Sequence, residues 1–369
     1  MSRIRVLVVD DSALMRALLS RIIGAQPDMA VSGLASDPII AMNRLHTSVP
    51  DVITLDVEMP KMSGLEFLER LMRVRPLPVV MVSSLTARGA EVTLRALELG
   101  AVDFIAKPES LLGGALDLYF EEVAEKIRAA AGARLARLRH RTRVEARIAA
   151  RPAGGAVQYR AIVIGASTGG VEALHDVLEV LPVDMPPILI AQHMPAGFTS
   201  SFAQRLDSTC QIGVKEAQDG EALRRGQAYI APGGRHMMLA IRADGLAVRL
   251  SDGPPINRHR PSVDPLFRSA AHIVGKRCIG VMLTGMGADG ASAMLELKRS
   301  GAYNIAQDAA TCVVYGMPMQ AVKAGAVQEE LAITAIPHRL VELCSGAGAM
   351  HEASHSPAQG APPIISRDA

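Results

Sequence analysis

The stretch Arg160-Ala-Ile-Val-Ile-Gly165-Ala-Ser167-Thr-Gly-Gly170 is a continuous apolar strand that opens onto a serine and two glycines. Two further apolar strands, Pro187–Gln192 and Cys278–Thr284, are followed by His193 and Asp289. Uninterrupted apolar strands that alternate with helices are typical of a parallel sheet covered on both faces. Open α/β sheets place their sites at the carboxyl ends of the strands. We therefore expect Ser167, His193 and Asp289 at one edge of such a sheet.

These three residue types together favour acyl transfer through a serine nucleophile. A hydroxyl attacks poorly until a base takes its proton, and the base needs a carboxylate to hold its tautomer and stabilise its cation. Each residue also has a structural interpretation, since Asp289 could cap the predicted helix Ala291–Arg299 and His193 could satisfy a backbone carbonyl. Capping and catalysis are compatible. We predict Ser167 as nucleophile, His193 as general base and acid, and Asp289 as orienting carboxylate.

The turn from Gly165 to Gly170 leads into a helix expected near Val171. A helix amino terminus presents unpaired N–H groups where an oxyanion can form. The turn lacks the Gly-x-Gly-x-x-Gly spacing of a dinucleotide site and the Lys-Ser/Thr of a P-loop. The chain order serine, histidine, aspartate also differs from the serine, aspartate, histidine order of α/β-hydrolases. The sequence therefore favours a serine hydrolase of another fold.

The amino-terminal third repeats a strand–helix alternation of its own. Continuous apolar segments separated by helical periodicity, as in Leu14–Ile23 and Leu65–Arg73, predict a second doubly wound parallel sheet. The fold class is thus α/β, with two doubly wound parallel-sheet domains, which the family resemblances given below imply to be flavodoxin-like and then Rossmann-like. The predicted strands of the first sheet are Ile4–Val9, a short strand near Ala30–Ala35, Val52–Leu55, Val79–Val82 and Asp103–Ala106.

Acidic side chains follow two of these strands. Asp10 and Asp11 come after the first strand and Asp56 after another, so their carboxylates should converge at one sheet edge. They would repel one another without a hard cation, and Mg²⁺ prefers such oxygen ligands. A carboxylate can also accept a phosphoryl group. Ser83 and Lys107, at two further strand ends, would supply a hydroxyl and a cation to the phosphoryl oxygens.

Composition and length are those of a globular protein with two cores. The 369 residues are 49% hydrophobic and 21% charged, with a net charge of +2 that indicates neither nucleic acid nor an anionic membrane as main partner. The four cysteines have no metal-site or redox spacing. We expect a cytoplasmic protein, because the sequence shows no signal peptide and no apolar run near the ~20 residues of a membrane span.

A change of composition divides the chain. We predict one domain over residues 1–127, a basic flexible linker over 128–158, a catalytic domain over 159–345 and a disordered tail over 346–369. The linker could be a solvated helix or could contact an acidic partner. Nucleic-acid binding would need a groove-reading element, which the sequence does not show. Its basic residues are Arg134, Arg137, Arg139, Arg141, Arg143, Arg147 and Arg151.

The motif Val8-Val9-Asp10-Asp11-Ser12, the run Leu55–Pro60 and the pair Lys107-Pro108 resemble a two-component receiver domain. The resemblance covers residues 1 to about 125 and implies that Asp56 accepts a phosphoryl group from a chemotaxis histidine kinase. It also implies a set of further roles. Asp10 and Asp11 would hold Mg²⁺ with Asp56 and the Val57 carbonyl, Ser83 and Lys107 would respond to the phosphoryl group, and Phe104 would be the aromatic switch.

The second half resembles the CheB family of chemotaxis protein-glutamate methylesterases. The resemblance rests on Gly165–Gly170, Gln192–Pro195 and Leu283–Gly290, and it extends to Tyr229–Met237, Pro261–Phe267 and Gly316–Pro318. It implies hydrolysis of glutamate methyl esters on chemoreceptors, without a cofactor for that step, and leaves deamidation of receptor glutamines open. The amides of Thr168 and Met286 are our candidates for the oxyanion hole, and His236 and Asp264 for shaping the cleft.

Other interpretations stay open from sequence alone. The esterase could act on a non-flagellar chemosensory receptor, or a receiver could control a binding domain without enzymatic activity. The second would need salt-dependent DNA binding and a helix-turn-helix, which residues 159–345 do not suggest. We expect a monomer, because no coiled-coil pattern or apolar stripe indicates self-association, and no insertion into membranes.

Overall fold

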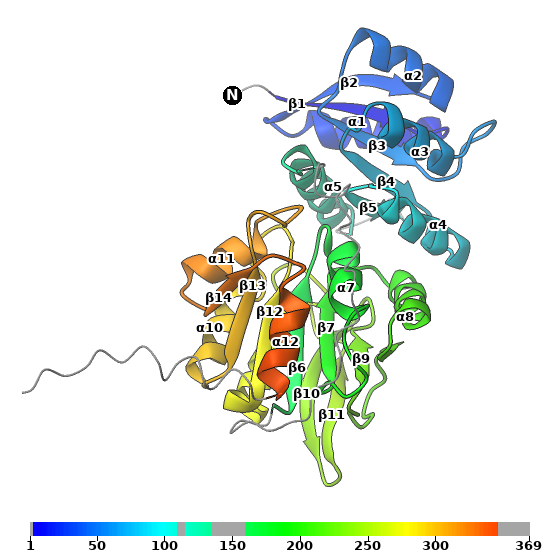
Figure 1. Cartoon of the computed structure of the whole chain (residues 1–369). Helices are drawn as coiled ribbons and strands as arrows, with labels where there is room; N and C mark the ends of the chain where they lie inside the picture. The colour runs from blue at the N-terminus through cyan, green and yellow to red at the C-terminus, as the bar shows by residue number, and fades with distance from the viewer. Residues whose placement is uncertain (1–2, 109–114, 135–158, 346–369) are drawn as a thin grey trace, which may run out of the picture.

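Two α/β units follow one another along the chain (Figure 1). The computed structural model describes residues 3–108, 115–134 and 159–345. Most of the predicted linker, residues 135–158, and the predicted tail, residues 346–369, lie outside the described residues. Within the described part of the chain, no helix has both the length and the apolar character that crossing a bilayer requires.

The first unit is a five-stranded parallel sheet in the order β2-β1-β3-β4-β5. This is the flavodoxin-like order, and its site lies where the chain reverses direction between β1 and β3. The fold-class prediction is confirmed here. The strands are β1 (Ile4–Val9), β2 (Met29–Ala35), β3 (Val52–Asp56), β4 (Val79–Ser83) and β5 (Asp103–Ala106).

Four helices of this unit follow residues whose side chains bind free backbone N–H groups. Ser12 accepts from Met15 N, and Ser63 forms a capping box with Glu66. Such caps are worth about 1 kcal/mol each because they satisfy donors that a helix cannot pair internally. The helices are α1 (Ala13–Gly24), α2 (Pro38–Thr47), α3 (Gly64–Val74), α4 (Ala87–Glu98) and α5 (Ala115–Ala131).

The second unit is built on a seven-stranded parallel sheet in the order β14-β13-β12-β6-β7-β9-β8. From β6 the chain builds outward through β7, then returns to β12 on the other side of β6, which makes the β6–β12 edge the topological switch point. The strands are β6 (Ala161–Ala166), β7 (Ile188–Gln192), β8 (Gly213–Glu216), β9 (Gln227–Ile230), β12 (Cys278–Met282), β13 (Tyr303–Gln307) and β14 (Glu329–Leu331).

Helices cover this sheet on both faces, and an antiparallel hairpin extends from it at the end far from the first unit (Figure 1). That hairpin joins β10 (His236–Arg242) to β11 (Gly245–Ser251), which pair from His236 with Ser251 to Arg242 with Gly245 and are partly buried. The parallel-sheet prediction did not include it. The helices are α7 (Gly170–Leu178), α8 (Phe198–Thr209), α9 (Val263–Ile273), α10 (Ala291–Arg299), α11 (Met317–Lys323) and α12 (Ile336–Ser345).

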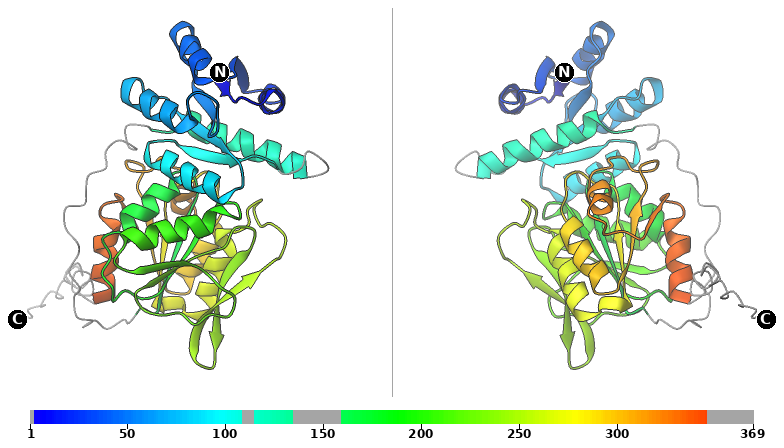
Figure 2. Two further views of the ribbon diagram at one scale, coloured as in Figure 1. Left: turned by 90° about the vertical axis from the view of Figure 1, so that its right-hand side faces the viewer. Right: turned by 90° about the vertical axis from the view of Figure 1, so that its left-hand side faces the viewer.

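The first unit faces the carboxyl edge of the second sheet with α4, β5 and α5 (Figures 1 and 2). Helix α4 packs against α7 and α8. The rings of Phe104 on β5 and Phe198 on α8 lie 4.5 Å apart, and the guanidinium of Arg205 on α8 pairs with Glu98 on α4. The predicted strand-end residues Ser167, His193 and Asp289 therefore lie under the receiver-like unit.

Candidate active site

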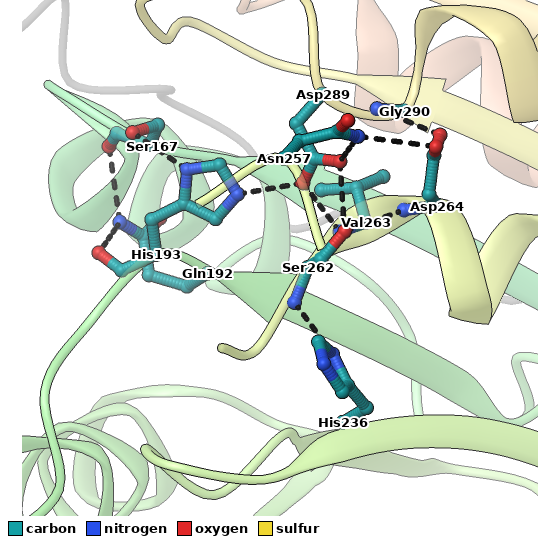
Figure 3. Close-up of polar contacts among 10 residues, drawn as sticks. All are labelled: Ser167, Gln192, His193, His236, Asn257, Ser262, Val263, Asp264, Asp289 and Gly290. Carbon is teal, nitrogen blue, oxygen red and sulfur yellow. Dashed lines mark hydrogen bonds and ion pairs between the residues drawn. The ribbon is translucent and has the colours of Figure 1, made fainter. Parts of the chain in front are cut away.

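Three strand ends bring a serine, a histidine and an aspartate into one line (Figure 3). Ser167 follows β6, His193 follows β7, and Asp289 lies between β12 and α10. Nδ1 of His193 is 3.1 Å from Oγ of Ser167, and its Nε2 is 2.8 Å from Oδ2 of Asp289. The imidazole and the carboxylate are nearly inaccessible, with side-chain exposures of 7% and 2%. The three side chains predicted together are together.

The orientation of the imidazole determines which nitrogen can take the serine proton. Because an ionised Asp289 only accepts hydrogen bonds, Nε2 of His193 must carry the ring proton, which leaves Nδ1 free to accept from Ser167. In trypsin-like proteases the two nitrogens have the opposite assignment. The roles of base and orienting acid are the same in both arrangements.

Asp289 is surrounded by donors. Its Oδ1 accepts from Nδ2 of Asn257 at 2.7 Å and from Oγ of Ser262 at 2.8 Å, and its Oδ2 accepts from the amide of Val263 at 2.7 Å. Burial by itself raises the pKa of Asp289, but the hydrogen bond and charge of His193, with the bonds from Asn257 and Val263, outweigh it and hold that pKa well below the usual range. The carboxylate therefore stays charged throughout the neutral range.

The capping interpretation of Asp289 is wrong. The N-cap of α10 is Gly290, at φ 83°, and no side chain caps that helix. The amide of Gly290 instead donates to Oδ1 of Asp264 at 3.1 Å. Asp289 is thus directed away from the helix end and toward His193 (Figure 3).

The backbone around Ser167 is held in a sharp strand-to-helix turn. Gly165, Ser167 and Gly169 have the Gly-x-Ser-x-Gly spacing of a nucleophile elbow, and Gly169 adopts φ 76°, in the left-handed region that favours glycine. A side chain at Gly285 would lie 2.8 Å from Cβ of Ser167, so only glycine lets that loop approach so closely. The turn presents the serine to a cavity between the two units.

The two predicted oxyanion donors lie beside the nucleophile. Thr168 and Met286 line the same cavity as Ser167. In the described part of the chain, neither backbone amide donates to a protein acceptor. Two free N–H groups next to a nucleophile can bind a developing oxyanion.

The sequence analysis missed several residues that support this site. Asn257 and Ser262 bind Asp289, and Nε2 of Gln192 donates to the carbonyls of Ser167 at 3.0 Å and His193 at 3.2 Å. Asn257 and Ser262 lie in an irregular segment before α9, where no strand-end pattern marks them. Gln192 could have been found, because it directly precedes the predicted histidine.

Two further histidines adjoin the site. The ring of His259 stacks on that of His193, with centroids 3.7 Å apart and an interplanar angle of 13°. Burial, and then the charge of His193, lower the pKa of His259 to about 3, so this ring is neutral near pH 7. His236 is buried, accepts from the amide of Ser262 at Nδ1 and bonds the carbonyl of Pro254 through Nε2. It holds the segment that carries Ser262.

A cavity of about 1380 Å³ opens above these residues and is lined by both units. Its receiver-side wall includes Asp103, Lys107 and helix α5. Oγ1 of Thr168 donates to Oδ2 of Asp103 at 2.5 Å across the boundary between the units. The first unit therefore directly contacts the residue that follows the serine.

A second cluster of polar groups, with Asp10 and Asp56 buried and Asp11 exposed, lies at the carboxyl edge of the first sheet. Ligand atoms of Asp10, Asp11 and Asp56 lie within 4.8 Å of one another. Nζ of Lys107 is 2.8 Å from Oδ1 of Asp56 and 3.6 Å from Oδ2 of Asp10. The predicted carboxylates and lysine are brought together as expected from the strand ends.

This cluster has spare oxygen ligands. Oδ2 of Asp10 and Oδ2 of Asp56 are buried without a hydrogen-bond partner. Burial raises the pKa of Asp56 to about 6, with the charge of Asp10 adding to the effect and Lys107 opposing it. Orphaned, mutually repelling carboxylate oxygens are the donor set that a hard divalent cation satisfies, so the residues fit Mg²⁺.

Three other residues predicted for this site, Ser83, Val57 and Phe104, make contacts of their own outside the carboxylate cluster. Ser83 is buried at the end of β4, and its hydroxyl donates to the carbonyl of Gly89 at 3.3 Å. The carbonyl of Val57 accepts from the amide of Gly64 at 3.0 Å, so one of its lone pairs is already used. Phe104 lies at the boundary with the second unit, against Phe198.

Comparisons with known proteins divide the chain in the same way. Residues 162–340 match the family described as CheB methylesterase, and residues 6–112 match the response regulator receiver domain. A protein-glutamate methylesterase/protein-glutamine glutaminase of Nitrosomonas europaea is 54% identical, over 94% of this chain and 98% of its own. Its counterpart in Paraburkholderia xenovorans is 53% identical with the same coverage.

Solved structures include a similar catalytic unit. The crystal structure of the Thermotoga maritima CheB methylesterase catalytic domain is 42% identical, with a TM-score of 0.49, and covers 51% of this chain and all of its own. The curated relatives, by contrast, extend over both units of this chain.

Proposed function

The chain belongs to the CheB methylesterase family, with a receiver domain before the catalytic domain, and we propose that phosphorylation of its receiver activates hydrolysis of glutamate methyl esters on chemotaxis receptors. Asp56 is the proposed phosphoacceptor, and a chemotaxis histidine kinase is the proposed donor. The observation that carries the catalytic part is the hydrogen-bonded line from Ser167 through His193 to Asp289.

Acylation begins when Nδ1 of His193 takes the proton of Ser167 and Oγ attacks the ester carbonyl. The imidazolium that forms is stabilised by Asp289, which is fixed by its own donors and cannot turn away. The amides of Thr168 and Met286 bind the oxyanion. Methanol leaves as His193 returns the proton to the ester oxygen, which gives an acyl-serine.

Water then completes the cycle. His193 removes a proton from water, hydroxide attacks the acyl carbonyl, and the serine leaves with the proton that His193 returns. The receptor side chain becomes a glutamate carboxylate, so one neutral group becomes an anion. The same steps with ammonia as leaving group would deamidate glutamine, which the names of the relatives include.

The proposed switch rests on the receiver residues that contact the catalytic domain. Strand β5 carries Asp103, bonded to Thr168, and Phe104, packed on Phe198, and it leads directly to Lys107, bonded to Asp56. A change at Asp56 that moves Lys107 can therefore shift both interdomain contacts. In the arrangement described, both domains line the cavity above Ser167, and the docked receiver would hinder a receptor helix from entering it.

Mg²⁺ would be held by Asp10, Asp11 and Asp56, and when bound it would neutralise the phosphoryl oxygens during transfer. Lys107 orients the carboxylate of Asp56 through its 2.8 Å contact, and Asp10 is fixed by the amide of Ser12. The hydroxyl of Ser83 can exchange its bond to Gly89 for a phosphoryl oxygen. We propose no cofactor for the esterase reaction.

The test is methanol release from methylated chemoreceptor membranes, with and without acetyl phosphate and Mg²⁺. The parent should release methanol and do so faster with acetyl phosphate, while Ser167→Ala should release none although it folds normally. Release that persists in Ser167→Ala would refute the serine mechanism.

Two other results would correct parts of the proposal. Release that depends on Ser167 but is unchanged by acetyl phosphate would retain the esterase and remove the switch. Absence of release from chemotaxis receptors, with Ser167-dependent hydrolysis of methylated receptors from another chemosensory system, would assign the enzyme to that substrate.

A further inference from the structure

An arginine at the entrance of the catalytic cavity is bound by two receiver carboxylates. Nη1 of Arg258 lies 2.8 Å from Oε2 of Glu121 and 2.9 Å from Oε1 of Glu125. Both glutamates are on α5, one helical turn apart, and all three residues line the cavity that contains Ser167. The catalytic domain thus presents a guanidinium to a pair of glutamates on a helix.

The turn that carries Arg258 is built on the catalytic residues. Ile256 and His259 exchange backbone hydrogen bonds of 3.1 and 2.9 Å, and Asn257 and Arg258 between them have φ values of 51° and 68°. Outside this turn, only Lys61 among the described non-glycine residues has positive φ. Such a backbone is costly and persists only where its surroundings fix it, as at functional sites.

The residues on either side of Arg258 provide that fixation. Nδ2 of Asn257 donates to Asp289 at 2.7 Å and to Asp264 at 3.1 Å, and the ring of His259 stacks on His193 at 3.7 Å. The backbone of Arg258 therefore has a defined position relative to His193 and Asp289, and its side chain extends from that fixed point. A group placed in this way relative to the reacting atoms can position a substrate.

An ion pair that only joined the domains would not need a turn whose backbone is fixed by contacts with the catalytic residues. The three side chains are 58%, 56% and 33% exposed, and ion pairs of this exposure contribute about 0–1 kcal/mol. Within the same boundary, Phe104 with Phe198 and Asp103 with Thr168 are better buried. The contact with α5 therefore adds little to docking, while it pairs the charge of an arginine that lines the same cavity as Ser167.

We propose that Arg258 binds glutamate carboxylates that flank the ester on the substrate helix, and that Glu121 and Glu125 take their place when the receiver is docked. The proposal rests on the proposed function, because that function supplies a substrate rich in glutamate. A planar guanidinium suits two carboxylates one helical turn apart. The receiver then competes with substrate for a charge as well as for space.

Steady-state kinetics of the full-length protein test the role of Arg258 in binding. With acetyl phosphate and Mg²⁺, Arg258→Gln should raise KM for methylated receptor membranes about tenfold, the loss expected for a charge-assisted hydrogen bond, and leave kcat within about twofold. Receptors whose flanking glutamates are replaced by glutamine should show a high KM with both enzymes. The matched control is Arg260→Gln, because among the described residues the Arg260 guanidinium bonds only the carbonyls of Asp252 and Gly253.

The double variant Glu121→Gln/Glu125→Gln tests the competition. Without acetyl phosphate it should lower KM at least threefold, and this gain should vanish when Arg258→Gln is added. If Arg258 were only an interdomain clamp, Arg258→Gln would raise the unstimulated rate as the double variant does and would leave KM of the phosphorylated enzyme unchanged. Either of these two results overturns the proposal.

A binding measurement separates this proposal from the proposed function. Ser167→Ala, with and without Arg258→Gln, is sedimented with the same receptor membranes in the presence of acetyl phosphate and Mg²⁺, which requires no turnover. Weaker binding with Arg258→Gln supports the proposal even if the parent releases no methanol, in which case the proposed function fails alone. The role of Arg258 is refuted if the two proteins bind parent receptors equally well and if each binds the glutamine-substituted receptors as tightly as the parent receptors.

Discussion

Two buried aspartates, each at the carboxyl edge of a parallel sheet, have opposite electrostatic surroundings. Asp289 has donors on both oxygens, and its pKa is held well below the usual range although burial opposes this. Asp56 has an oxygen without a partner, and burial raises its pKa to about 6. Both oxygens of Asp289 are paired within the protein, whereas Asp56 pairs one oxygen with Lys107 and leaves the other free for a ligand.

The difference fits the roles that we propose for the two carboxylates. An orienting carboxylate must be charged and motionless throughout the reaction, so neutral donors and an imidazole enclose it. A phosphoacceptor must keep a free lone pair and be able to take a cation and a phosphoryl group, so its surroundings are left incomplete. Incomplete hydrogen bonding in a buried site here indicates a ligand, and complete hydrogen bonding indicates a built-in catalyst.

The largest expected effect is that of Asp289→Asn. An amide there favours the wrong tautomer of His193 and cannot stabilise its cation, so kcat for methanol release should fall on the order of 10⁴-fold. The measurement is release from methylated receptors at saturating substrate. If Asp289 and Asp56 differ in function as we propose, Asp56→Asn should retain unstimulated methanol release. A similar loss of kcat in both variants would contradict that difference.

Asp56→Asn should abolish stimulation by acetyl phosphate and should stabilise the receiver in EDTA. Because the pKa of the folded state is raised, the unfolded parent releases its proton first as pH rises from about 4 to 6, and parent stability falls over that window. The advantage of the variant should therefore grow over the same window to on the order of 2–3 kcal/mol. Calorimetry at several pH values measures it, and an advantage that shrinks with rising pH would reverse the assigned sign.

Two helix-capping serines separate the catalytic effect from the structural one. Ser262 caps α9 and also donates to Asp289, whereas Ser63 caps α3 in the receiver, remote from the serine. Ser262→Ala and Ser63→Ala should each cost about 1 kcal/mol of stability. Only Ser262→Ala should also lower kcat, about tenfold, since it removes a donor to a charged group. Equal kcat values in the two variants would show that the donors of Asp289 do not matter.

The smallest effect should come from removing divalent cations. EDTA should leave unstimulated methanol release unchanged within error, because the mechanism that we propose for Ser167, His193 and Asp289 uses no metal. Mg²⁺ should raise the melting temperature of the parent by a few degrees and that of Asp56→Asn less, because it satisfies the orphaned oxygens. Unequal release with and without EDTA would mean that the two sites are not independent.

Much of both sites was predictable because their residues follow parallel strands. Strand ends of one sheet converge at one edge, so Ser167 and His193 after β6 and β7, and Asp10 and Asp56 after β1 and β3, could be placed together from apolar runs alone. The helix Ala291–Arg299 was also predicted with its observed bounds. Resemblance added the roles of these residues, which a strand pattern does not contain.

The supporting residues could not be predicted in this way. Asn257 and His259 lie on an irregular turn, and their contacts with Asp289 and His193 depend on left-handed backbone angles that non-glycine residues rarely adopt. The function of Asp289 as a helix cap was a reasonable expectation from local sequence. It failed because Gly290 begins the helix and the donors around Asp289 come from a distant segment.

The sequence by itself determined two α/β units, the chemistry at their strand ends and the order of nucleophile, base and acid. Only the tertiary structure decided that Asp103 reaches Thr168, 65 residues away, and that α5 holds Arg258. The physical reason is that strand and helix patterns arise from neighbours within a few residues. Contacts between domains depend instead on how two finished surfaces pack, and no local periodicity encodes that.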